Sequence, residues 1–436
     1  MYDFIGAIKK NEIYEEYGYL IRFTLRWLIL GSIVGIFCGI VISAFIIGLR
    51  WVTDFRIFNL WIISFLPLAG VATGWLYKQF GRGSEQGSDL IIDEVLEFHG
   101  RVLFRMGPLV LIATLLAHLF GGSAGREATG VQIGGAIASK LARTLKLARR
   151  DAQMMMMAGI SGGFSAIFGT PVAAAIFGME VISRGEIKFA SAIACVASAI
   201  AAAMIGHALA PVNDSYLAPN ILVVDIWLIG KLLLATIAFA YAAVIFTELT
   251  HWIARRSQQL IPNVYLRPAI GGVIIIALYL IVRDDRYLGL SNGFVHGATS
   301  GAIFPSYAWA LKILFTSLTL GFGFRGGDVF PLFVIGALLG STLAPMLNMD
   351  PAVLGAIGFV AVFASASKTP IAATIMGIEI FGPTYAIPFI LVNFVGYMLA
   401  GHSGIYTSQR RSSFGFEEPE EVAVIDEMKK TLEDKA

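Results

Sequence analysis

The sequence predicts an all-α, polytopic membrane protein made of two inverted-topology repeats with broken helices, and three observations support this fold class. The chain of 436 residues is 57% hydrophobic and only 14% charged, whereas soluble domains carry about 25% charged residues. It contains uncharged runs long enough to cross a bilayer. Two motifs of its first half also recur about 200 residues later.

The apolar runs define the expected membrane spans. Residues 27–49, WLILGSIVGIFCGIVISAFIIGL, form 23 positions without a charge, and a helix needs about 20 residues to cross the hydrocarbon core. Similar runs lie at 59–77, 103–120, 189–212, 222–246, 268–282, 305–324, 329–347 and 384–401. Backbone polar groups in lipid must be satisfied within the element, so we expect each run to be a helix.

The charged segments predict the orientation and the boundaries. The loops at 139–151 and 251–259 are basic, whereas 211–225 has no lysine or arginine. The positive-inside rule therefore places the basic loops and the amino terminus in the cytoplasm of a multi-pass protein of the cell (inner) membrane. The expected segments are a cytoplasmic amino-terminal segment at 1–23, repeat 1 at 24–210, a connecting loop at 211–225, repeat 2 at 226–405 and a short charged cytoplasmic tail at 406–436.

Several other function classes find no support in the sequence. The net charge of +2 gives no indication of nucleic-acid binding, and the two cysteines, Cys38 and Cys195, lack metal-ligand spacing. No HExxH or GxSxG motif stands in a suitable context, so we expect no enzyme activity, no metal and no cofactor. A cation transporter would favour carboxylates and carbonyls at its site, and Arg126 beside Glu127 argues against one.

The internal repeat indicates where a site would lie. TPVAAAIFGMEV (170–181) matches TPIAATIMGIEI (369–380) at an offset of 199 residues, and GREATGVQIGGAI (125–137) aligns with GGDVFPLFVIGAL (326–338) at an offset of 201. Glu127 then falls opposite Asp328, and Gly135 opposite Gly336. Repeated halves with glycine-broken hydrophobic segments are typical of transporters and channels whose site lies at the repeat interface.

Three glycine-containing motifs are candidate helix starts at that interface: GSDLI (87–91), GREATG (125–130) and GGDVFP (326–331). A helix N-terminus presents free N–H groups and a partial positive charge, which together bind anions. Glycine lets the backbone approach the ion closely. We expect the segments at 125–137 and 326–338 to start two short helices whose N-termini converge from opposite sides of the membrane.

These motifs resemble those of the CLC family of anion channels and proton-coupled anion antiporters. GREATGVQIGG resembles the family's G-[KR]-E-G-P-x-V-Q-x-G segment, GGDVFP stands where the family has G-x-F-x-P, and GSDLI stands where it has G-S-G-I-P. FGTPVAAAIFGMEV and SKTPIAATIMGIEI match its two proline-to-glutamate segments, and the resemblance covers roughly residues 25–405. It implies an inverted-repeat fold, a homodimer in the lipid bilayer, and one pathway per subunit for chloride or fluoride ions and protons.

The resemblance also implies roles for single residues. Glu127 matches the gating and proton-coupling glutamate, Ser88 the hydroxyl of a central anion site, and Tyr385 lies near the inner-gate tyrosine, one residue late in the alignment. The full set of expected anion-binding residues is Ser88, Gly125, Arg126, Ala128, Gly327, Asp328, Val329, Phe330 and Tyr385.

Departures from the chloride-exchanger pattern favour the fluoride-exporting branch. Val181 stands where those exchangers have a second, proton-transferring glutamate, Asp328 replaces an aliphatic residue, and Val329 replaces a phenylalanine. An acid followed by an aliphatic residue resembles the corresponding motif of the fluoride branch. Two residues depart from that branch: Phe330 stands where it has a threonine, and Ser88 resembles the chloride type. The expected function is proton-coupled halide antiport with fluoride export. The alternatives are a chloride channel or a chloride/proton exchanger of the same family, and more remotely a transporter of an unrelated substrate.

Each candidate has a structural alternative. Glu127, which costs roughly 2.5–3.5 kcal/mol to insert at mid-membrane, could form an ion pair with Arg126. Asp328 could cap the helix that begins near Val329, and Phe330 could be a core side chain. Ser88 could be an N-cap and Tyr385 an interfacial tyrosine. Glu180 and Glu379, which occupy matched repeat positions, more readily brace backbone N–H groups than move protons.

The predicted homodimer has its own sequence signal. Residues 190–210, ASAIACVASAIAAAMIGHALA, are rich in alanine, serine and glycine, which allow close packing of membrane helices. The family resemblance also places the subunit interface on hydrophobic spans late in each half.

Overall fold

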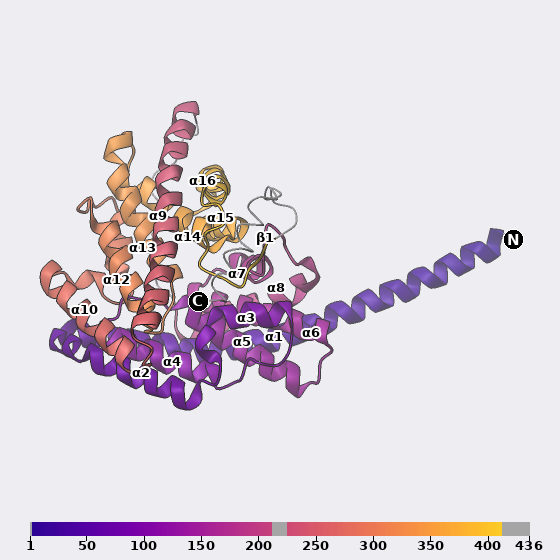
Figure 1. The fold of residues 1–436 in the computed structure, drawn as a ribbon. Coiled ribbons are helices and arrows are strands. Elements are labelled where there is room, and N and C mark those ends of the chain that lie inside the picture. Colours follow the sequence, from indigo (N-terminus) through magenta and orange to yellow (C-terminus); the bar gives the residue numbers. More distant parts are fainter. Residues whose placement is uncertain (1, 212–224, 412–436) are drawn as a thin grey trace, which may run out of the picture.

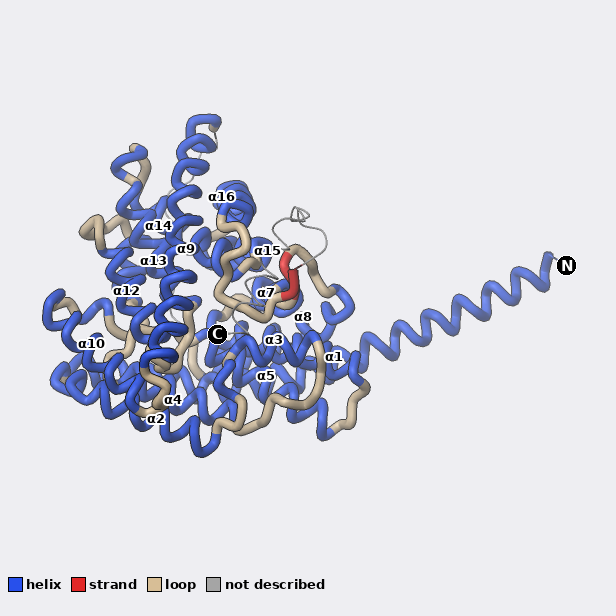
Figure 2. Tube along the Cα trace, in the orientation of Figure 1, coloured by secondary structure: helices blue, strands red, loops and turns tan. Residues whose placement is uncertain are grey.

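The computed structural model describes residues 2–211 and 225–411, and within these ranges it contains sixteen α-helices, six short 3₁₀ helices and one pair of two-residue strands. Figure 1 shows the helices gathered in one body, with the amino-terminal turns of α1 extending beyond it. Figure 2 shows how little of the chain is strand. The predicted connecting loop at 211–225 and the tail beyond residue 411 lie almost entirely outside the described residues.

The helices of the first half are α1 (Tyr2–Phe58), α2 (Leu66–Phe80), α3 (Ser88–Leu96), α4 (Met106–Leu119), α5 (Glu127–Thr144), α6 (Arg149–Phe168), α7 (Pro171–Glu180) and α8 (Ala192–Leu209). Those of the second half are α9 (Ile226–Leu260), α10 (Leu266–Val282), α11 (Asn292–Thr299), α12 (Ala308–Gly321), α13 (Val329–Leu343), α14 (Pro351–Ser367), α15 (Pro370–Phe381) and α16 (Ala386–Leu399). The 3₁₀ helices are η1 (Leu60–Phe65), η2 (Ser84–Gln86), η3 (Phe189–Ser191), η4 (Asp285–Tyr287), η5 (Pro345–Leu347) and η6 (Pro383–Tyr385), and the strands are β1 (Ser183–Arg184) and β2 (Arg410–Arg411).

Helix lengths fit a polytopic membrane protein with broken helices. Among the described residues, four segments are long and apolar enough to cross a membrane, namely Tyr17–Phe58, Leu60–Phe80, Phe189–Leu209 and Ile226–Leu260. The other apolar helices have 10 to 17 residues, fewer than the roughly 20 needed for a full crossing. Three helices, α7, α14 and α15, begin with proline, which costs no backbone hydrogen bond at the first helical position.

The two halves contain the same succession of eight helices. α4 and α12 begin at Met106 and Ala308, α5 and α13 at Glu127 and Val329, and α6 and α14 at Arg149 and Pro351, so each pair is offset by 202 residues. This confirms the repeat.

Reciprocal contacts relate the two halves. The carboxylate of Glu180, at the end of α7, accepts hydrogen bonds from the backbone N–H groups of residues 371 and 372 at the start of α15 (3.0 and 2.7 Å). Glu379 of α15 accepts from residues 172 and 173 at the start of α7 (3.0 and 2.8 Å). Such an exchange of identical contacts is what a two-fold relation produces. The prediction that both glutamates brace backbone N–H groups is confirmed.

The small residues of α8 pack inside the chain rather than on its surface. A Cβ atom at Gly31 of α1 would lie 2.5 Å from the carbonyl oxygen of Ala194, and one at Gly35 would collide with that of Ser198. The glycines therefore let α1 approach the backbone of α8 closely. The small-residue face that suggested a subunit interface is occupied by α1.

The chain after α16 returns to the body of the protein. β2 pairs in parallel with β1, with Ser183 opposite Arg410, and Gln409 donates to the carbonyls of Val181 (3.0 Å) and Ser367 (2.9 Å). Residues 406–411, expected to open the charged tail, are therefore part of the fold.

Candidate functional site

The starts of α5 and α13 meet inside the protein. The N–H of Gly125 donates to the carbonyl of Gly327 (2.6 Å), and the N–H of Gly327 donates to that of Gly125 (2.8 Å). This antiparallel bridge joins the residues just before the two helices. The prediction that the segments at 125–137 and 326–338 start helices with converging N-termini is confirmed.

Glu127 spans this junction. It is the first residue of α5 and is completely buried, yet its Oε2 accepts a hydrogen bond from the backbone N–H of Phe330 in the first turn of α13 (3.0 Å). Its Oε1 has no hydrogen-bond partner among the described residues. A carboxylate therefore sits where the N-terminal N–H groups and dipole of α13 favour negative charge.

Two glycines make room for this carboxylate. A Cβ atom at Gly327 would lie 2.7 Å from Glu127 Oε2, and one at Gly125 would collide with the same oxygen. Any larger side chain at either position would displace the carboxylate or the bridge.

Arg126 and Phe330 flank the junction. The guanidinium of Arg126 lies 5.8 Å from the centroid of the Phe330 ring, and both side chains are buried. Phe330 also packs edge-on against Phe333. Val329 is the first residue of α13 and is buried in the core.

A cavity of about 190 Å³ lies beside the junction. Its lining includes residues 86–89 at the start of α3, Ala128 and Gln132 of α5, Gly326 and Asp328 before α13, and Ile405 and Tyr406. The starts of three helices thus converge on one small cavity, as the three glycine motifs predicted. Ser88, Ala128 and Asp328 of the expected set line it.

Asp328 does not act as a conventional cap. It precedes α13, but its side chain makes no capping hydrogen bond, and its Oδ1 has no hydrogen-bond partner among the described residues. Its carboxyl group therefore stands at the cavity wall next to the Glu127 junction.

The tyrosine at this cavity is Tyr406 and not Tyr385. Tyr385 is buried in η6, where its ring packs on Phe389, and it does not line the cavity. Tyr406 does, within electrostatic range of Glu127, Asp328 and Asp89. Asp89 holds this segment by accepting hydrogen bonds from Thr407 (2.7 Å) and Ser408 (3.1 Å). Sequence reasoning missed Tyr406, although it follows the last span in the glycine-containing stretch GHSGIYTSQ.

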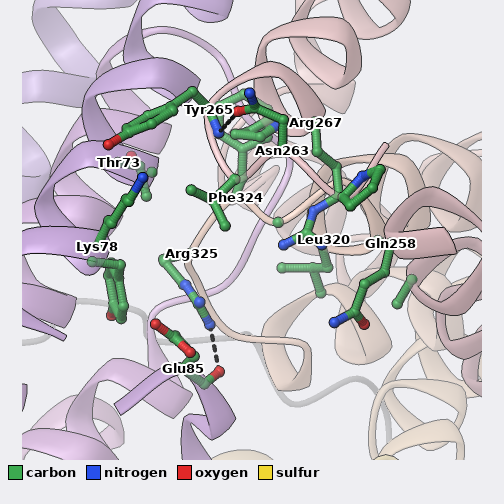
Figure 3. Close-up of a pocket in the computed structure, with 18 of the residues that line it drawn as sticks. Thr73, Lys78, Glu85, Gln258, Asn263, Tyr265, Arg267, Leu320, Phe324 and Arg325 are labelled. Carbon is green, nitrogen blue, oxygen red and sulfur yellow. Dashed lines mark hydrogen bonds between the residues drawn. The ribbon is translucent and has the colours of Figure 1, made fainter. Parts of the chain in front are cut away.

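A wider vestibule of about 770 Å³ adjoins the small cavity. Leu320, Phe324 and Arg325 line both spaces, so these side chains form a wall that the vestibule and the cavity share. Figure 3 shows Arg325 and Arg267 projecting into the vestibule from two different segments, with Lys78 on the wall. Of the described residues, four basic side chains and one acidic side chain line it: Lys78, Arg82, Arg267, Arg325 and Glu85.

Comparison with known proteins decides the family. The voltage gated chloride channel family model matches residues 69–401. The chain belongs to this family, the CLC family. This CLC chain is 38% identical over 415 residues to a protein of Pseudomonas syringae pv. tomato named chloride/fluoride channel protein, covering 93% of this chain and 92% of that protein.

Solved structures agree with the fold. A crystal structure of a CLC-type fluoride/proton antiporter superposes with a TM-score of 0.86 at 31% identity, covering 89% of this chain and 98% of the other. A slow cyanobacterial Cl⁻/H⁺ antiporter superposes with a TM-score of 0.72 at 18% identity, covering 88% and 96% of the two chains. The chain is therefore an all-α, multi-pass CLC membrane protein with two inverted repeats, and it transports anions.

Proposed function

We propose that this protein exchanges halide ions for protons, exporting fluoride, through a pathway formed by the vestibule, the small cavity and the Glu127 junction. The observation that carries the proposal is the hydrogen bond from the Phe330 N–H to the Glu127 carboxylate. A negative oxygen occupies a position that a halide would take at the start of α13.

The proposed coupling follows from competition for that position. An ionised Glu127 carboxylate accepts hydrogen bonds from the N–H groups at the start of α13 and so excludes the anion. A protonated Glu127 has no negative charge to keep its side chain in that position. Protonation then releases the side chain, and a halide replaces it. Because Val181 stands where the chloride exchangers have a second glutamate, coupling depends entirely on Glu127.

The other site residues have proposed roles in the same pathway. Ser88 and Tyr406 line the small cavity, and their hydroxyl groups can donate to an anion there. Gly125, Gly327 and Ala128 bring the backbone close to it. Arg126 supplies positive charge near Phe330.

Fluoride is favoured over chloride by two independent supports. The relative at 31% identity is named a fluoride/proton antiporter, and the name of the relative at 38% identity gives both chloride and fluoride. The acid at Asp328, followed by Val329, also departs from the chloride pattern. Ser88 and Phe330 favour the alternative, a chloride transporter of the same fold.

We further propose that the protein lies in the cell (inner) membrane with its amino terminus in the cytoplasm and forms a homodimer with one pathway per subunit. The boundaries proposed for the halves are 24–210 and 226–405. The succession of eight helices in each half supports them.

The test is anion efflux from proteoliposomes, with fluoride compared with chloride and proton uptake recorded in parallel. Wild type is expected to move fluoride faster than chloride, with protons moving in the opposite direction. Glu127→Gln mimics the protonated state, so anion flux should persist while proton movement disappears. Glu97→Gln, which changes an exposed glutamate of the same half, is the control and should behave as wild type.

Three outcomes would contradict the proposal. A folded Glu127→Gln protein with wild-type proton coupling would remove Glu127 from the gate. Equal or greater chloride efflux would favour the chloride alternative. Loss of expression in Glu127→Gln alone would support the structural ion pair with Arg126.

A further inference from the structure

The vestibule contains two arginines whose guanidinium groups are incompletely bonded. Arg267 lies in the first turn of α10 and Arg325 lies just before α13. The Nε atoms of both are buried and have no hydrogen-bond partner among the described residues. The two positive charges act on each other, and the single negative charge of Glu85 acts on the pair as well, so a further anion between the two arginines would be favoured.

Their neighbours fix the two groups in place, and the acidic side chain of Glu85 offsets only part of their charge. Arg325 donates from Nη1 to the backbone carbonyl of Glu85 (2.8 Å) and lies 4.2 Å from the centroid of the Tyr77 ring. Arg267 lies against Gly323, where a Cβ atom would be 3.4 Å from its Nε and Nη2. Gly323 has a positive φ of 95°, a conformation that favours glycine. Figure 3 shows both side chains facing the same space.

The shape and charge of this space select a class of ligand. A volume of about 770 Å³ is far larger than a halide needs and falls in the range of small-molecule sites, about 300–1,000 Å³. Guanidinium forks bind oxyanions through paired N–H bonds, which a spherical halide cannot match. Two guanidinium groups, with Lys78 and Arg82 also lining the vestibule, favour a doubly charged oxyanion over a singly charged one.

We propose that Arg267 and Arg325 form a binding site for a soluble, doubly charged tetrahedral oxyanion of the sulfate or phosphate type. Because Arg325 also lines the small cavity, an ion bound here stands between the vestibule and the cavity. It therefore competes with the transported halide. The competition rests on the proposed function, whereas the binding itself does not.

Binding is tested first, by isothermal titration of sodium sulfate into the purified protein in detergent without halide. Sulfate keeps its double charge across neutral pH, which makes it a cleaner probe than phosphate. Wild type is expected to bind one sulfate per subunit. Arg267→Gln should weaken binding by about tenfold or more, since it removes a charged fork. Arg267→Lys keeps the positive charge but loses the paired N–H donors, so its sulfate affinity should lie between those of wild type and Arg267→Gln.

Arg82→Gln is the matched control, because it removes the same charge from an exposed side chain lining the same vestibule. It should change sulfate affinity less than Arg267→Gln does. If both variants weakened sulfate binding equally, the overall positive charge of the vestibule, rather than a specific site, would attract the sulfate. No sulfate binding to wild type at millimolar concentrations would overturn the proposal.

Competition is tested by halide efflux from proteoliposomes with sulfate on both sides of the membrane. Sulfate should raise the apparent KM for the halide without changing the maximal flux. The halide flux of each protein is normalised to its own flux without sulfate. Arg267→Gln should then need about tenfold more sulfate than wild type for the same fractional inhibition. Sulfate that binds in the titration but inhibits Arg267→Gln and wild type alike would refute the competitive placement. Sulfate binding by a protein that moves no halide would refute the proposed function and leave the binding site standing.

Discussion

Glu127 belongs to α5 by sequence but serves α13 by its hydrogen bond. The carboxylate reaches across the Gly125–Gly327 bridge to the first turn of α13. The glycines are as necessary to this arrangement as the glutamate. Each leaves open the volume in which Oε2 lies.

Gly327→Ala should imitate Glu127→Gln without altering a charge. The added Cβ would stand 2.7 Å from Oε2 and 3.1 Å from the N–H nitrogens of Glu127 and Ala128, so the carboxylate must leave its position. Anion flux is expected to persist while the number of protons moved per anion falls. Proton uptake in the efflux assay measures this.

The control for that substitution is Gly230→Ala in α9, where an added Cβ meets nothing within 4 Å. It should keep wild-type coupling. A Gly327→Ala protein with unchanged coupling would show that the observed carboxylate position is not the gating one.

At the scale of helices, α7 and α15 stabilise each other by exchanging glutamate caps. Each carboxylate accepts two backbone N–H bonds at the partner's first turn, and those N–H groups have no partner within their own helix. The exchange fixes the two proline-started helices relative to one another. The two caps differ in exposure, since Glu180 is 3% exposed and Glu379 lies at the surface.

Removing these caps should therefore have unequal effects. Glu180→Ala leaves two N–H groups unsatisfied, one buried and one partly buried, at up to roughly 1–3 kcal/mol each, whereas water can replace the carboxylate of the exposed Glu379. We expect the Tm in detergent to fall for both variants and to fall further for Glu180→Ala. Differential scanning fluorimetry measures the Tm, and Glu97→Ala should leave it unchanged. A larger fall in Tm for Glu379→Ala than for Glu180→Ala would contradict the assignment of Glu180 as the more buried of the two caps.

Some helices of the structure could be predicted from the sequence and others could not. The predicted spans correspond to α1, α2, α4, α8, α9, α10, α12, α13 and α16, because these segments carry continuous apolar runs. α5, α6 and α14 were not among them, although most of their residues are buried. α5 and α6 are surrounded by other helices, so glycine, alanine and serine suffice where lipid would require larger apolar side chains.

The role of a single residue was harder to predict when contacts with residues far away in the sequence determine its position. The role of Glu127 could be inferred because the local motif and the repeat both point to it. Tyr406 could not, because Gln409, β2 and Asp89 bring its segment to the cavity through contacts with residues far away in the sequence. α1 likewise continues past residue 49, where the uncharged run ends, and buries Arg56.

At the scale of the whole molecule, the last helices of the two halves present apolar side chains on their outer faces. Val196, Ile200 and Met204 of α8 are 43%, 48% and 69% exposed, at the spacing of one helix face. Ile387 and Met398 of α16 are 59% and 62% exposed. α8 packs on α7 and α16 on α15, while α7 contacts α15, and Figure 1 shows these helices close together.

This face is where we expect the homodimer to form, since α1 occupies the small-residue face of α8. Ile200→Trp combined with Ile387→Trp adds bulk while keeping the face apolar, so it should prevent close packing of subunits without disturbing contact with lipid. Light scattering in detergent should give a dimer for wild type and a monomer for the double variant. Because each subunit has its own proposed pathway, flux per chain should persist. Ile281→Trp, at a 79% exposed position of α10, should remain dimeric. A wild-type protein that is monomeric at every concentration would contradict the dimer, and a double variant that stays dimeric would move the interface elsewhere.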